Sequence, residues 1–203
     1  MKGSATRVFE PLDAPRPKGA RLLEAFSPKL GRRVRLFDHA AFGQWIVLEV
    51  DPTVLCLCER PARLGVNRDG RLIDFWVQRH DGAEMMLLDR DDRAQPVLEQ
   101  IDGVPLRIVA RAELAAAGIW IANWQRMLPV INATRGLLPK GLATSVANFV
   151  CEPVALSRVE HELSVGDPSL ARGAIFELLQ TGRLLAPTLH TQPLSLHTLL
   201  EPA

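Results

Sequence analysis

Three short apolar segments follow one another closely in the middle of the chain and constrain its fold more than any other feature. They cover residues 54–58, 72–77 and 85–88. Turn sequences that contain an Asp-Gly pair separate them, at residues 67–70 and 81–82. Short apolar runs bounded by such turns are typical of antiparallel strands joined as hairpins. The sequence therefore predicts a small sheet at this place.

Helical patterns lie on both sides of these segments. Residues 36–50 carry apolar side chains at helical intervals and stop at Asp51-Pro52. A further strand is expected over 105–109, followed by helices over 113–117 and 119–131. A mixed sheet flanked by helices is an α/β layer fold. We expect this α/β domain to cover residues 35–135.

The last third of the chain has a different character. Helices are expected near residues 145–151, 156–163 and 168–180, and a short strand near 183–187. Three compact helices followed by a strand are typical of a winged helix, with residues 168–180 in the recognition position. The sequence thus predicts a small, α-rich, winged-helix-like domain over 136–203. The alternative is a helical cap on the first domain, and the scarcity of positive charge argues against DNA contact here.

Charge is distributed unevenly along the chain. The first 35 residues carry nine basic residues and three acids, a balance of +6. They are also rich in proline and glycine, so we expect residues 1–34 to form an extended basic arm. Such an arm attracts phosphate, although it equally serves as a solvated tail. The candidate DNA-binding residues are the basic ones near its end: Lys29, Arg32, Arg33 and Arg35.

The sequence does not favour a membrane or secreted protein, nor a zinc-binding one. No apolar run is long enough to span a bilayer, and the first residues lack the apolar stretch of a signal peptide. Three cysteines are present, Cys56, Cys58 and Cys151, and their spacing lacks the second pair that a zinc site needs. Reduced thiols in a cytoplasmic protein are therefore expected.

One aspartate, Asp74, lies in the otherwise apolar segment 72–77. Because burial of an unpaired carboxylate is costly, Asp74 should bind a cation or accept hydrogen bonds. Nucleases of the restriction-endonuclease type use such a residue. They need two or three oxygen ligands for Mg²⁺ and a lysine near the attacking water. Usually a helix supplies a glutamate, one strand an aspartate, and the next strand an acid-x-Lys triplet.

The order of several motifs resembles the transposon endonuclease subunit TnsA over roughly residues 28–200. The motifs are Val50-Asp-Pro-Thr-Val54, Cys58-Glu-Arg-Pro61, Asp74-Phe75, Asp81-Gly82, Ile108-Val-Ala-Arg-Ala-Glu-Leu114 and Trp120-Ile-Ala-Asn123. The resemblance implies a restriction-endonuclease-like core of the PD-(D/E)xK type. It also implies DNA and a transposase or another mobile-element protein as partners, and Mg²⁺ as the cofactor if the site cuts DNA.

The expected catalytic positions depart from this pattern. The helix glutamate of the family falls near Ala41, which has no metal-binding group. The acid-x-Lys triplet falls on Leu88-Asp-Arg90 or, shifted by one residue, on Asp89-Arg-Asp91. Arginine stabilises negative charge but does not readily act as a base. The candidate catalytic residues are therefore Asp74, Asp89, Arg90 and Asp91, in a site that has lost part of its machinery.

Three functions remain open at this point. The first is a TnsA-like component of a transposition or mobile-element system that acts on DNA with a transposase, its nuclease activity lost or altered. The second is an active Mg²⁺-dependent endonuclease that cuts at transposon ends through a rearranged acidic cluster, for which the candidate metal ligands are Glu49, Glu59, Asp74 and Asp89. The third is an interaction or regulatory protein without a nucleic-acid role.

Overall fold

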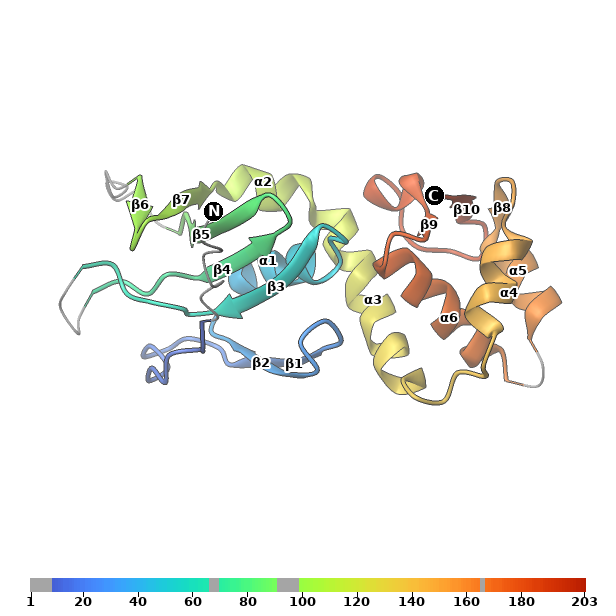
Figure 1. The fold of residues 1–203 in the computed structure, drawn as a ribbon, viewed down its shortest axis with the longest axis horizontal. Coiled ribbons are helices and arrows are strands. Elements are labelled where there is room, and N and C mark those ends of the chain that lie inside the picture. The colour runs from blue at the N-terminus through green and yellow to red at the C-terminus, as the bar shows by residue number, and fades with distance from the viewer. Residues whose placement is uncertain (1–8, 66–69, 91–98, 165–166) are drawn as a thin grey trace, which may run out of the picture. The chain divides into compact units, whose positions relative to one another are not determined.

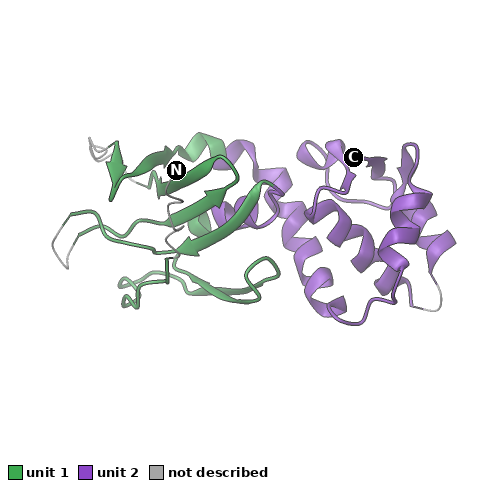
Figure 2. Ribbon diagram, in the orientation of Figure 1, with its two compact units in different colours: residues 1–42, 53–113 green, residues 43–52, 114–203 purple. Residues whose placement is uncertain are grey.

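The structure is a computed structural model that describes residues 9–65, 70–90, 99–164 and 167–203. The chain divides into two compact units (Figure 2). Unit 1 comprises residues 1–42 and 53–113, and unit 2 comprises residues 43–52 and 114–203. Residue 135, where the sequence predicts the end of the first domain, directly follows helix α3 (Gly118–Thr134), and this helix belongs to unit 2.

Unit 1 contains a mixed sheet of five strands in the order β3-β4-β5-β7-β6 (Figure 1). The strands are β3 (Val54–Glu59), β4 (Phe75–Arg79), β5 (Gly82–Leu88), β6 (Gln100–Ile101) and β7 (Val104–Val109). The first three are antiparallel neighbours, and β7 runs parallel to β5. This arrangement confirms the predicted sheet and the turn at 81–82. The turn expected at 67–70 lies largely outside the described residues.

Side chains on both faces of this sheet are buried. One face carries a cluster formed by Cys58, Ile73, Trp76, Met85 and Leu87, on which the ring of Phe9 lies 5.3 Å from that of Trp76. The alternate residues of β4 and β5 are buried as well. Because successive side chains of a strand point to opposite faces, a continuous apolar run indicates a sheet covered on both sides.

A two-stranded hairpin precedes the sheet, in a stretch where the sequence predicts an extended arm. It consists of β1 (Leu23–Ser27) and β2 (Arg32–Leu36), which pair antiparallel. The prediction is wrong for this part of the arm. In β2, Val34 and Leu36 are buried while Arg33 and Arg35 are exposed. Buried and exposed residues alternate here as in a half-buried strand, but the many basic residues around them favour the prediction of an arm.

Two helices complete this part of the chain, α1 (His39–Glu49) and α2 (Arg111–Ala116). The predicted helix over 36–50 is confirmed with a later start, because β2 extends to Leu36. The carboxylate of Asp38 caps α1 and accepts a hydrogen bond from the backbone nitrogen of Ala41 at 2.6 Å. Most sides of α1 are buried, which its low helical amphipathicity reflects.

Unit 2 combines helices with a small sheet. The helices are α3 (Gly118–Thr134), α4 (Leu142–Phe149), α5 (Leu156–Leu163), α6 (Pro168–Gln180) and the short 3₁₀ helix η1 (Pro187–His190). The strands β8 (Val154–Ala155), β9 (Leu184–Leu185) and β10 (Leu199–Pro202) pair antiparallel in the order β8-β10-β9. In the described parts of the chain, no helix has the length and apolar character needed to cross a membrane.

Helix α6 forms the centre of unit 2 and packs against α3, α4 and α5. Its close approach to α3 depends on Gly173, where an added Cβ would lie 2.2 Å from the hydroxyl oxygen of Thr134. The segment between β9 and β10 is attached to α3 by Asn123. Its amide nitrogen donates to the carbonyls of Leu189 and Gln192, both at 2.8 Å, and its oxygen accepts from the nitrogen of Leu194 at 2.7 Å.

Candidate functional site

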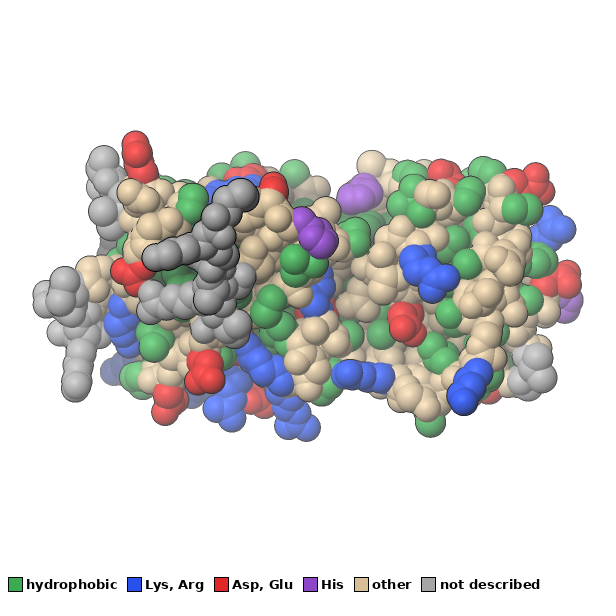
Figure 3. Space-filling model, viewed as in Figure 1, with side chains coloured by type: hydrophobic (Ala, Val, Ile, Leu, Met, Phe, Trp, Pro, Cys, Tyr) green, Lys and Arg blue, Asp and Glu red, His purple; other side chains and the backbone are tan. Residues whose placement is uncertain are grey.

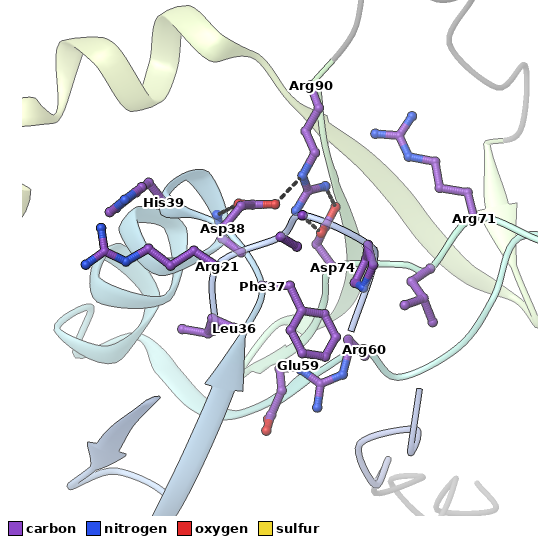
Figure 4. Close-up of a pocket in the computed structure, with 15 residues that line it drawn as sticks. Arg21, Leu36, Phe37, Asp38, His39, Glu59, Arg60, Arg71, Asp74 and Arg90 are labelled. Carbon is purple, nitrogen blue, oxygen red and sulfur yellow. Dashed lines mark hydrogen bonds and ion pairs between the residues drawn. The ribbon is translucent and has the colours of Figure 1, made fainter. Parts of the chain in front are cut away.

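A cavity of about 550 Å³ lies in unit 1, where several strands of the sheet begin or end. Three neighbouring strand ends contribute to it, because β3 ends at Glu59, β4 begins just after Asp74, and β5 ends two residues before Arg90. The start of α1 adds Asp38 and Ala41 to its wall. The hairpin connections thus gather polar residues that are distant in sequence (Figure 4).

Arg90 connects two carboxylates in this cavity (Figure 4). Its two terminal nitrogens donate to the oxygens of Asp74 at 2.9 and 2.6 Å. Its Nε donates to Oδ2 of Asp38 at 2.7 Å. Asp74 accepts a third hydrogen bond, from the backbone nitrogen of Leu88 at 2.7 Å. The buried carboxylate of Asp74 therefore finds the partners that its place in an apolar strand requires.

This network holds Arg90 as a cation. Burial lowers the pKa of the Arg90 guanidinium, but its hydrogen bonds and charge interactions with Asp74 and Asp38 outweigh burial and raise the pKa above its ordinary value. Bidentate pairs of this kind are the strongest that arginine forms with carboxylates. Arg90 therefore lies between the two acids as a permanent positive charge.

The structure brings Asp74 and Arg90 together and adds Asp38, which the sequence analysis missed. Asp38 carries a local signal, since an aspartate directly before a helical pattern is a common N-cap. Its pairing with Arg90, 52 residues away, leaves no local signal. Ala41, where the family's helix glutamate is expected, lines the same cavity.

The two glutamates proposed as metal ligands have other partners. Glu59 lines the cavity, but both of its oxygens accept hydrogen bonds from Arg32, at 2.8 and 2.7 Å. Hydrogen bonding to Glu59 raises the pKa of Arg32 against the effect of burial. Glu49 belongs to unit 2, where its carboxylate accepts a hydrogen bond from Gln180 at 3.2 Å. Asp74 belongs to unit 1.

Asp89 directly follows the last residue of β5. The backbone nitrogen of Asp89 donates to Val109 at 3.0 Å, which continues the pairing of β5 with β7. Asp91 lies outside the described residues. Among the residues that are described, no three histidine, cysteine, aspartate or glutamate side chains lie together as ligands of a metal ion. The residues around Asp74 do not fit Mg²⁺ as they stand, because the guanidinium of Arg90 lies between the carboxylates.

The four predicted DNA-binding residues differ in their surroundings. Lys29 donates to the backbone carbonyl of Val54 at 2.8 Å, and Arg32 is paired with Glu59. Arg33 and Arg35 lie on the exposed face of β2, and Arg35 forms an exposed ion pair with Glu24 at 2.9 Å. Lys and Arg side chains gather over the β1–β2 hairpin in the view of Figure 3.

In this cavity the carboxylates of Asp74 and Asp38 lie beside the guanidinium of Arg90. Among the described residues they do not form part of a metal-ligand cluster. Arg90 can stabilise an anion or hold the two aspartates in place, but it does not readily accept a proton. No protein-family model matches the chain, and no curated protein matches it significantly.

Proposed function

We propose that this protein is a TnsA-like component of a transposition or other mobile-element system. It binds DNA, acts together with a transposase, and has lost or altered the nuclease activity of the family it resembles. The proposal rests on the sequence motifs together with a coarse agreement of the fold, a mixed sheet with Asp74 and Arg90 at adjoining strand ends.

The observation that carries the proposal is the place of Arg90. In a restriction-endonuclease-type site, a divalent cation would lie beside the strand aspartate and would supply the activated water. Here a guanidinium contacts Asp74 through two nitrogens and reaches Asp38 through a third. It supplies a fixed positive charge and the hydrogen bonds that the carboxylates need. It cannot generate hydroxide, so the site keeps its organisation without the means to cut.

Unit 2 fits the second part of such a protein. Its order, α4, β8, α5, α6, β9, β10, with β10 between the other two strands, is the order of a winged helix. In that comparison α6 takes the recognition position. Its one arginine, Arg172, is paired with Glu160 of α5, and most of its side chains are buried. We therefore assign DNA contact to unit 1 and contact with a protein partner to unit 2.

Binding and cutting of DNA are tested together. Fluorescence anisotropy with labelled DNA, both single-stranded and duplex, should show binding that weakens as salt rises. The charge reversals Arg33→Glu and Arg35→Glu should abolish it, whereas Arg158→Glu in unit 2 is the matched control and should not. Supercoiled plasmid incubated with Mg²⁺ or Mn²⁺ should stay uncut.

Each other outcome favours a competing function. Nicking by the wild-type protein that disappears in Asp74→Ala would establish the active endonuclease and overturn the loss of cutting. Absence of binding to any DNA, at low salt as well, would favour an interaction or regulatory protein and overturn the proposal. An integrase-type transposase gene beside this one is also expected.

A further inference from the structure

A second cavity adjoins the one that holds Arg90 and Asp74. Its volume is about 420 Å³, and its wall is formed by residues 11–16 together with the exposed face of β2. The two cavities share Phe37, Glu59 and Arg60 in their linings. They are therefore neighbouring parts of one hollow in unit 1, and we call them together the arginine groove.

The groove carries positive charge that nearby acids do not neutralise. Within the described parts of the chain, five guanidinium groups in its lining form no ion pair with a carboxylate: Arg16, Arg21, Arg33, Arg60 and Arg71. Arg60 and Arg71 donate only to backbone carbonyls, and one acid of the lining, Asp13, has no ion pair among the same residues. An excess of cations in a concave surface concentrates positive potential and attracts phosphate.

An aromatic ring lies where the two cavities meet. Phe37 is half-buried between β2 and α1, and the guanidinium carbon of Arg60 lies 4.8 Å from its ring centroid. Figure 4 shows the ring of Phe37 between Arg60 and the Arg90–Asp74 pair in that view. Aromatic rings in basic grooves serve as stacking platforms for bases, and an arginine beside the ring adds a cation–π contribution.

We infer that the arginine groove binds a single strand of nucleic acid, with phosphates on the guanidinium groups and an unpaired base on Phe37. The inference rests on the proposed DNA-binding function and adds the form of DNA that this surface recognises. A double helix, whose major groove alone is about 12 Å wide, is too wide to enter a cavity of about 550 Å³. The bases of a duplex are also stacked on one another, so only an unpaired base is free to lie on Phe37.

Binding of three labelled probes by the full-length chain tests this inference. The probes are a thymidine oligonucleotide, an abasic oligonucleotide with the same backbone, and a duplex of equal length. The wild-type protein should prefer the thymidine strand to the abasic one. Phe37→Leu, which keeps an apolar side chain but removes the ring, should weaken binding of the thymidine strand about 5- to 100-fold and should leave the abasic strand unchanged.

Arginine variants provide a second readout that does not depend on the ring. Arg33→Gln should weaken both single strands and reduce the slope of log affinity against log salt by about 0.7. Arg183→Gln, an exposed arginine of unit 2, is the matched control and should change nothing. Circular dichroism of each variant establishes that it is folded. If Phe37→Leu fails to fold, the Arg33→Gln slope and the preference for thymidine over the abasic strand decide the question.

The possible failures can be told apart. Tight duplex binding without single-strand binding would overturn the groove but leave the proposed function intact. Equal affinity for thymidine and abasic strands would show a purely electrostatic surface and would overturn the role of Phe37. Absence of binding to all three probes would overturn this inference and the proposed function together.

Discussion

Arg90→Ala removes the guanidinium that lies between the carboxylates of Asp74 and Asp38, and its effect on stability follows from their burial. The Asp74 side chain is 9% exposed and that of Arg90 31%, so this pair is mostly withdrawn from water. Loss of one partner from a fully buried pair costs about 3 to 5 kcal/mol. The Asp38 side chain is 37% exposed, and exposed pairs contribute only about 0 to 1 kcal/mol.

We therefore expect Arg90→Ala to lower the free energy of unfolding by about 2 to 3 kcal/mol, below the range of a fully buried pair. The variant also leaves two carboxylates of the same cavity without their shared cation. Carboxylate oxygens are the ligands that Mg²⁺ and Mn²⁺ prefer. A divalent cation should then bind the variant and restore part of its stability, by about 1.4 kcal/mol at ten times the dissociation constant.

Urea unfolding followed by tryptophan fluorescence, with and without Mn²⁺, measures both effects. Arg32→Ala is a matched control, because Arg32 is 37% exposed and holds the 3% exposed Glu59 through two nitrogens. It should lose similar stability and gain little from Mn²⁺, since it frees a single carboxylate. Adding Asp38→Asn to Arg90→Ala should remove the response to metal. The reasoning is refuted if Mn²⁺ stabilises Arg90→Ala no more than Arg32→Ala.

Three further predictions concern the core, a loop and pH. Gly173→Ala should cost about 1 to 3 kcal/mol in urea unfolding, because its Cβ would meet Thr134; a stability equal to that of the wild type would contradict this contact. Asn123→Ala should leave three backbone groups unpaired and speed proteolysis between β9 and β10, whereas unchanged digestion would show that the loop needs no anchor. Burial raises the pKa of the Cys58 thiol from 9.0 to about 12. Stability should therefore be intact below pH 9.0 and fall by up to about 1.4 kcal/mol per pH unit toward pH 12, as the unfolded thiol ionises first; equal slopes in Cys58→Ala would exclude this cause.

The sequence predicts the central part of unit 1 well because its signals are local. Apolar runs and Asp-Gly turns lie within a few residues of one another, and they locate β3, β4 and β5. The hairpin between β4 and β5 then brings the start of one strand to the end of the other. The encounter of Asp74 with Arg90 follows from that register once the motif order is known.

The remaining contacts of the site are long-range, and no local pattern predicts them. Asp38 meets Arg90 across 52 residues, and Arg32 meets Glu59 across 27. Taken one at a time, these residues have ordinary local roles. Asp38 caps a helix, Glu59 ends a strand, and Arg32 belongs to a basic stretch of the sequence. The arginines of β2 lead to the prediction of an extended arm. Arg32 nevertheless shares a face of this strand with the buried Val34.

The identity of the basic residue at position 90 links these observations. A lysine presents a single ammonium and could not make three hydrogen bonds in the fixed directions that Asp74 and Asp38 require, whereas the planar guanidinium does. The resemblance predicts an acid near position 41 and, in one of its two registers, at position 88, where this chain has Ala41 and Leu88. In this structure the guanidinium of Arg90 supplies hydrogen bonds to both aspartates. Arg90 therefore joins the start of α1 to the ends of β4 and β5 through two carboxylates, and it does so with a fixed positive charge.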